Sequence, residues 1–181
     1  TQEAIELTLR AQKIGADGAL LITPYYNKPT QEGLFQHFSI VAKETEIPII
    51  LYNVPSRTSI NMLPRTVARL SSVNNIVGIK EALDSSERLS ELIKISQSIA
   101  DQKNFSVFSG DDPTFNSFMA NGGDGVISVA ANVVPSYISQ ICSLKLSGQF
   151  DEAKELNSIL ENLYELLFVE SNPIPVKWML N

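Results

Sequence analysis

The sequence has very little of the two residues on which many enzyme and metal sites depend. It contains one cysteine, Cys142, and one histidine, His37, among 181 residues. A single cysteine excludes a disulfide framework within the chain and any zinc site built from several cysteines. With one histidine, a histidine metal site or a Ser-His or Cys-His nucleophile is not expected, because each needs further partners.

Long apolar runs and basic clusters are also missing. No apolar run approaches the roughly 18 residues that a membrane span needs, and the opening TQEAIELTLR lacks the profile of a signal peptide. The expected compartment is therefore the cytoplasm. The net charge is -6 without a lysine or arginine cluster, which argues against a nucleic-acid surface because such binding depends on neutralised phosphates.

What the sequence does contain is an alternation of short apolar runs with stretches of helical spacing. The apolar runs cover residues 19–23, 47–52, 75–80, 105–110 and 125–129. Continuous apolar strands separated by helices are typical of a parallel sheet covered on both faces. We therefore predict one α/β domain, with strands and helices over 1–134 and a C-terminal helical segment over 135–181.

Within that C-terminal segment, helical spacing predicts helices over 136–146 and 150–168, followed by an extended NPIPVKW. Asp112 before Pro113 is a good N-cap and first-turn pair for another helix. Asp111 and Asp112 together have the composition of an acid-base pair, but capping and loop structure are the favoured interpretation.

Two architectures accommodate five such units, an open doubly wound sheet or a portion of a closed (β/α)8 barrel. The glycine-rich phosphate loop that marks the open sheet is absent. Polar residues follow the expected strands instead: Tyr25-Tyr26, Tyr52-Asn53, Lys80-Glu81 and Asp111-Asp112. The C-terminal strand ends of a barrel converge on one active face, which favours the barrel.

Lys80 ends the apolar run IVGIKEA, where a charge is unusual. A free lysine has a pKa near 10.4, so neutrality at pH 7 costs roughly 4.6 kcal/mol. Burial disfavours the ammonium and reduces this cost, as Schiff-base lysines require. Tyr52 ends the preceding strand, and its phenol can relay a proton. Two alternatives stay open: Lys80 extends to solvent or pairs with Glu81, and Tyr52 only fills the core.

Six stretches lie in order at expected strand ends or loops: TPYYNKPTQEG, YNVPSRT, GIKEA, SGDD, GVISV and NPIPVKW. Together they resemble the dihydrodipicolinate synthase family of pyruvate-dependent class I aldolases, over essentially the whole chain. The resemblance implies a (β/α)8 barrel, of which the chain carries about the last five βα units and C-terminal helices. It also implies a lyase of lysine (diaminopimelate) biosynthesis. In that reaction pyruvate forms a Schiff base with lysine and condenses with L-aspartate 4-semialdehyde to 4-hydroxy-tetrahydrodipicolinate.

The resemblance also assigns roles to catalytic residues. It makes Lys80 the Schiff-base lysine and Tyr52 the phenol that relays protons. It makes Arg57 the group that holds the semialdehyde carboxylate, which a guanidinium can grip with two parallel hydrogen bonds. Ile127 and Gly110 are placed around the bound pyruvate, and no metal or organic cofactor is expected.

Subunit contacts follow from the same resemblance. Tyr26 corresponds to a tyrosine that is lent to the active site of a neighbouring subunit. Tyr25 and Tyr26, between Pro24 and Asn27, form an aromatic pair on a turn, which is more often a subunit contact than a solvent-facing feature. We therefore expect a homo-oligomer, a dimer or a homotetramer, with both tyrosines near the interface.

Two departures of the sequence from the family pattern bear on the expected active site. Ser59 stands where many members have glycine, so a positive φ there would be less comfortable. The Gly-Thr-Thr-Gly-Glu loop, whose threonine completes the proton relay, has no counterpart. We therefore expect the C-terminal portion of a longer protein, poorly active alone. The alternatives are an N-acetylneuraminate or keto-deoxy-gluconate aldolase and a non-catalytic five-stranded α/β binding module.

Overall fold

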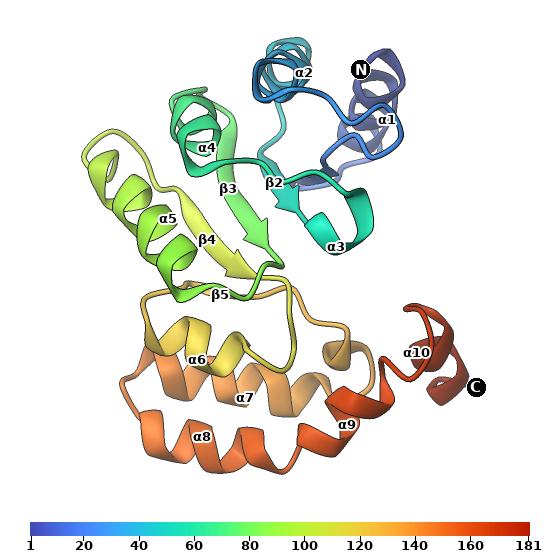
Figure 1. The fold of residues 1–181 in the computed structure, drawn as a ribbon, viewed down its shortest axis with the longest axis vertical. Helices are drawn as coiled ribbons and strands as arrows, with labels where there is room; N and C mark the ends of the chain where they lie inside the picture. Colours follow the sequence, from blue (N-terminus) through green and yellow to red (C-terminus); the bar gives the residue numbers. More distant parts are fainter. The chain divides into compact units, whose positions relative to one another are not determined.

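The computed structural model describes residues 1–181 and has an α/β fold (Figure 1). The strands follow one another in the order β1-β2-β3-β4-β5. Their bounds are β1 Ala19–Ile22, β2 Ile49–Asn53, β3 Ile76–Glu81, β4 Ser106–Ser109 and β5 Gly125–Val126. The predicted fold class and strand positions are thus confirmed, although β5 has two residues where the sequence predicted five.

The chain divides into two compact units, Thr1–Val107 and Phe108–Asn181. The predicted division of one domain at residues 134 and 135 stays a prediction. None of the helices combines the length and the apolar character that a bilayer crossing requires.

In the first unit, four helices lie side by side along the strands (Figure 1). They are α1 Gln2–Lys13, α2 Gln31–Glu44, α4 Pro64–Ser71 and α5 Ser86–Ser98, and the short α3 Pro55–Thr58 follows the end of β2. Helix α2 shows why they form: the Thr30 side chain caps its start by accepting a hydrogen bond from the Gly33 N–H at 3.1 Å. Leu34, Phe38 and Val41 follow at helical spacing and are fully buried.

Strands β2 and β3 are parallel, and their register places Tyr52 beside Lys80 and Asn53 beside Glu81. Because successive strand residues point to opposite faces, these two pairs lie on opposite sides of the sheet. Gly78 also belongs to β3, where a Cβ would lie 2.6 Å from the carbonyl oxygen of Ser106. Only glycine therefore fits where β3 approaches Ser106 of β4 so closely.

The second unit is mainly helical. It contains α6 Phe115–Ala120, the 3-10 turn η1 Ala130–Asn132, α7 Pro135–Leu146, α8 Phe150–Ser158, α9 Glu161–Leu166 and α10 Ile174–Met179. Its core includes Phe115, Ile141, Ala153, Tyr164 and Leu167, each at most 2% exposed. Burial raises the pKa of the Tyr164 hydroxyl, and the nearby Asp112, Cys142 and Glu161 raise it further.

Three sequence predictions in this unit are wrong. NPIPVKW was expected to be extended, but from Ile174 onward it belongs to α10, since Pro175 occupies the first helical turn, where a missing N–H costs no hydrogen bond. The single helix predicted over 150–168 ends at Ser158 and restarts at Glu161. Asp112 is not an N-cap: its Oδ2 accepts hydrogen bonds from the N–H groups of Val129 and Ala130 at 3.0 and 2.8 Å.

Candidate active site

Lys80 and Tyr52 meet at the C-terminal ends of β3 and β2. The Nζ atom of Lys80 lies 4.3 Å from the centroid of the Tyr52 ring, and both side chains are half-buried. The parallel register brings the two residues side by side. A cationic amine is attracted to the face of an aromatic ring, so the ring holds the end of the lysine over the phenol.

The Tyr52 hydroxyl is kept in its protonated form by its surroundings. Burial raises the pKa of Tyr52, and the positive charge of Arg57 partly opposes this shift. Arg57 is exposed on α3, which starts at Pro55, two residues after the end of β2, and is followed by its C-cap residue Ser59, where φ is 55°. The structure therefore brings a lysine, a protonated phenol and a guanidinium to one edge of the first unit.

A buried polar network lies behind this edge. The Glu81 carboxylate accepts hydrogen bonds from Arg88 Nε at 2.5 Å, from the Leu83 N–H at 2.9 Å and from Asn53 Nδ2 at 2.9 and 3.1 Å. Burial raises the pKa of Glu81, while Arg88, Asn53 and Leu83 oppose the shift. The ion-pair partner of Glu81 is thus Arg88, on the opposite side of β3 from Lys80.

The sequence reasoning missed Asn53 and Arg88. Arg88 lies in SERLSELIKIS, where a helix of mixed charge gives no sign that one arginine is buried. A signal for Asn53 was present, because it follows Tyr52 just as Glu81 follows Lys80. Two strands that each end in a polar pair indicate one polar residue on each face of the sheet.

Tyr25 and Tyr26 occupy the loop after β1 and are 61% and 93% exposed. The N–H of Thr23 donates to the carbonyl oxygen of Tyr52 at 3.2 Å, which joins the start of this loop to the end of β2. Tyr26 also lines a hollow of about 440 Å³ with Pro29 and His37. The tyrosine pair is therefore a solvent-facing feature of the isolated chain.

Gly110 and Ile127 belong to the second unit, where they follow β4 and β5. Ser109 pairs with Val126 in the parallel register, and the Ile127 N–H donates to the Ser109 carbonyl oxygen at 2.9 Å. Asp112 holds the segment after Ile127 through Val129 and Ala130. The two predicted substrate-contact residues are thus neighbours within this unit.

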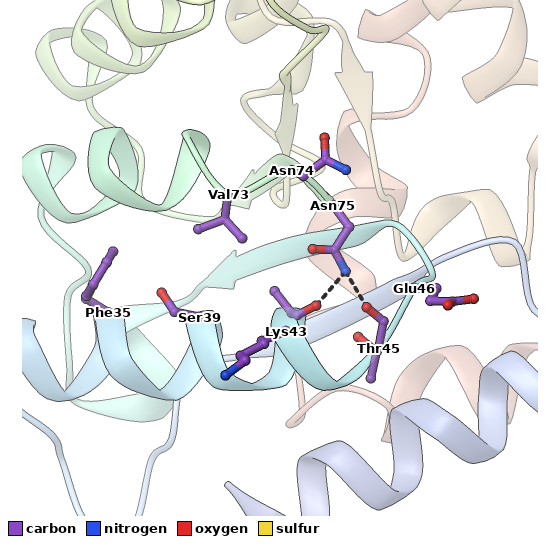
Figure 2. A pocket seen from close by; sticks show the side chains of 9 residues that line it. Phe35, Ser39, Lys43, Thr45, Glu46, Val73, Asn74 and Asn75 are labelled. Atoms are coloured by element: carbon purple, nitrogen blue, oxygen red, sulfur yellow. Dashed lines mark hydrogen bonds between the residues drawn. The ribbon is translucent and has the colours of Figure 1, made fainter.

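A separate cavity of about 580 Å³ lies at the other ends of β2 and β3 (Figure 2). It is lined by α2 and by the segments that precede the two strands. Asn75 Nδ2 closes one side by donating to the carbonyl oxygens of Ala42 and Thr45 at 3.0 and 2.9 Å. Barrel enzymes place their chemistry at the C-terminal ends of the strands, so this cavity is not the candidate active site.

Titratable side chains do not gather into a metal centre. No group of three or more histidine, cysteine, aspartate or glutamate residues is placed to hold a metal ion.

Consecutive βα units with polar residues at the strand C-termini are the arrangement of part of a (β/α)8 barrel. A sequence model of the dihydrodipicolinate synthetase family matches residues 1–181, and the chain belongs to this family. This confirms the resemblance read from the sequence.

Individual relatives agree with this assignment. The 4-hydroxy-tetrahydrodipicolinate synthase of Teredinibacter turnerae is 54% identical over 98% of the chain. A chloride-inhibited dihydrodipicolinate synthase from Acinetobacter baumannii, solved with pyruvate, is 49% identical over 98% of the chain, with a TM-score of 0.91. The lysine-bound enzyme of Cyanidioschyzon merolae is 36% identical over 99% of the chain, with a TM-score of 0.90. The chain spans 60%, 59% and 59% of these three relatives.

Proposed function

We propose that the complete protein is a 4-hydroxy-tetrahydrodipicolinate synthase, a cytoplasmic enzyme that condenses pyruvate with L-aspartate 4-semialdehyde. The observation that carries this proposal is the Lys80 amine 4.3 Å from the centre of the Tyr52 ring, at the strand ends. An amine beside a phenol suits Schiff-base chemistry, because imine formation needs both a nucleophile and a proton donor. The named relatives give the reaction its substrate class.

The reaction divides into steps that these groups can perform. The neutral Lys80 amine adds to the ketone carbon of pyruvate, and the resulting carbinolamine loses water to give the imine. Tyr52 donates the proton that the departing hydroxyl requires, since its raised pKa keeps the phenol protonated at neutral pH. The Tyr52 phenolate left by this step accepts the methyl proton that the imine loses when it becomes an enamine, and the enamine carbon then attacks the aldehyde carbon of the second substrate.

The remaining residues are assigned binding and assembly roles. Arg57 holds the carboxylate of the semialdehyde, which its exposed position on α3 allows. Gly110 and Ile127 contact pyruvate. The enzyme is a homo-oligomer, a dimer or a homotetramer, in which Tyr25 and Tyr26 lie near an interface and Tyr26 serves a neighbouring active site. Exposure of 61% and 93% for two adjacent tyrosines supports this contact.

Borohydride reduction in the presence of pyruvate tests the proposal. We expect a stable pyruvate adduct on Lys80 alone among the lysines, because Lys80 is the lysine that ends an apolar strand. Peptide mapping by mass spectrometry locates the adduct, and Lys80→Arg is the control that should abolish it. An adduct on Lys28 or Lys177 would contradict the site, and no adduct would favour a non-catalytic binding module.

The second aldehyde distinguishes between aldolases. We expect the pyruvate-loaded enzyme to condense with aspartate semialdehyde and not with N-acetylmannosamine or glyceraldehyde. Turnover with either of the last two would favour the N-acetylneuraminate or keto-deoxy-gluconate alternative.

A further inference from the structure

The network behind β2 and β3 is centred on one amide side chain, that of Asn53, which is fully buried. Its Nδ2 donates to the Glu81 carboxylate and to Asn61 Oδ1 at 3.0 Å, and its Oδ1 accepts from the Met62 N–H at 2.9 Å. Both amide hydrogens and the oxygen of Asn53 are thus in use. Arg88 completes the network by donating to Glu81 and, at 2.7 Å, to the Met62 carbonyl oxygen.

These bonds connect three segments that carry the proposed reacting and binding groups. Asn53 is the chain neighbour of Tyr52, and Glu81 is the chain neighbour of Lys80. Asn61 and Met62 follow the segment that contains Arg57. Each of these network residues is thus close in sequence to a site residue, adjacent to it on β2 and β3 and a few residues from it in the Arg57 segment. A shift at one of these bonds therefore moves the backbone of that site residue.

Strands β2 and β3 carry the proposed reacting groups on one face and the polar network on the other. The β2–β3 ladder ends at the Asn53–Glu81 pair, and one further backbone bond follows it, from the Ala82 N–H to the Asn53 carbonyl oxygen at 3.0 Å. The side-chain bonds of the network add to these backbone bonds at the strand ends. The network members on the strands face away from Lys80 and Tyr52, so they act on the site through the backbone without touching the substrate.

We propose that Asn53, together with the Glu81–Arg88 ion pair, is a positioning residue that sets the distance between the Lys80 amine and the Tyr52 phenol. The inference rests on the proposed function, since it assigns a supporting role in Schiff-base formation. Reacting groups must be held closely, because a displacement of about 1 Å can cost roughly 100-fold in rate.

The test is Asn53→Ala in the complete protein, with the rate of borohydride-trapped imine measured at saturating pyruvate. We expect this rate to fall by about 10- to 100-fold, while the KM for pyruvate stays within about threefold. Removal of the amide loosens the strand ends but deletes no group that touches pyruvate.

Lys103→Met is the matched control for lost stability. Lys103 Nζ donates to the carbonyl oxygens of Val73 and Ile76 at the opposite end of β3, so its removal loosens the same strand away from the site. We expect Lys103→Met to lower the unfolding temperature and to keep the trapping rate within about threefold of the unmodified protein.

A second variant covers the case in which Asn53→Ala does not fold. Glu81→Gln keeps the side-chain shape and weakens the contacts to Arg88 and Asn53, so a slower trapping rate is again expected. Trapping at the unmodified rate by whichever of these two variants folds, or equal slowing by Lys103→Met, would overturn the positioning role. Absence of any adduct in the unmodified protein would overturn the proposed function, and the positioning role with it.

Discussion

Tyr52 offers two different chemical surfaces to Lys80. Its ring contacts the lysine amine, with 4.3 Å between Nζ and the ring centroid, and its hydroxyl is a proton donor whose pKa is raised by burial. The two surfaces can be separated experimentally, because phenylalanine keeps the ring and removes the hydroxyl.

We expect Tyr52→Phe to lower kcat by about 10²- to 10⁴-fold, the usual contribution of one positioned proton-transfer group. The position of Lys80 should be unchanged, because the ring that it contacts remains. Steady-state kinetics with pyruvate and aspartate semialdehyde measure the effect. A kcat within about threefold of the unmodified enzyme would show that Tyr52 serves only as a packing surface.

Arg57→Ala is the contrasting variant in that experiment. Its main effect should be a higher KM for the semialdehyde, because a carboxylate grip is used in the ground state and the transition state alike. A large loss of kcat without a change in KM would instead place Arg57 in the chemical step.

Among the elements, α3 has a strained ending. It is followed by Ser59 at φ 55° and ψ 22°, the left-handed region that favours glycine. The sequence raised this possibility, because many family members have glycine at this position, and the structure confirms the positive φ. A serine in this conformation costs about 1 kcal/mol relative to glycine.

Ser59→Gly is therefore expected to stabilise the protein by about 0.5–1 kcal/mol, or about 1–4 °C in thermal midpoint. The matched control is Ser72→Gly at the end of α4, where φ is -77° and glycine offers no relief. That variant should lower stability, since glycine only adds freedom to the unfolded chain. Differential scanning calorimetry compares the two, and equal shifts would argue against strain at Ser59.

The elements also show what the sequence could and could not predict. Lys80 was identifiable because a charge at the end of an apolar strand contradicts its surroundings. The burial of Arg88 could not be predicted from the sequence, because it depends on hydrogen bonds to Glu81 and Met62, which come close to Arg88 only when the chain is folded. Helix α10 was missed because proline usually ends a helix, and only the position of Pro175 in the first turn makes it compatible with one.

At the scale of the whole molecule, β1 stands at one end of the strand order. Leu20 and Ile22 on this strand are 42% and 39% exposed. The relatives that the chain matches are longer, and the chain spans 60% of the first of them. A (β/α)8 barrel fills its interior from strands all the way round, so exposed side chains on β1 indicate an interior face without its neighbours.

We expect the isolated 181-residue chain to turn over pyruvate and aspartate semialdehyde at least about 100-fold more slowly than the same chain completed with the remaining segments of a close relative. An unpaired edge strand also favours association with other chains, so aggregation is expected in light scattering. Comparable kcat values for the two proteins would show that the additional segments are dispensable for catalysis.

The alternation of Lys80 and Glu81 across the two faces of β3 constrains how the gene can change. Loss or gain of a single in-frame codon before Lys80 within this strand would turn every later side chain to the other face. The carboxylate would enter the reaction site, and the lysine would be buried against Arg88. Such an event would remove the candidate nucleophile and the ion pair from their places together, unless a bulge absorbed the change, as the irregularity at Ile49/Ile50 already absorbs one extra residue of β3.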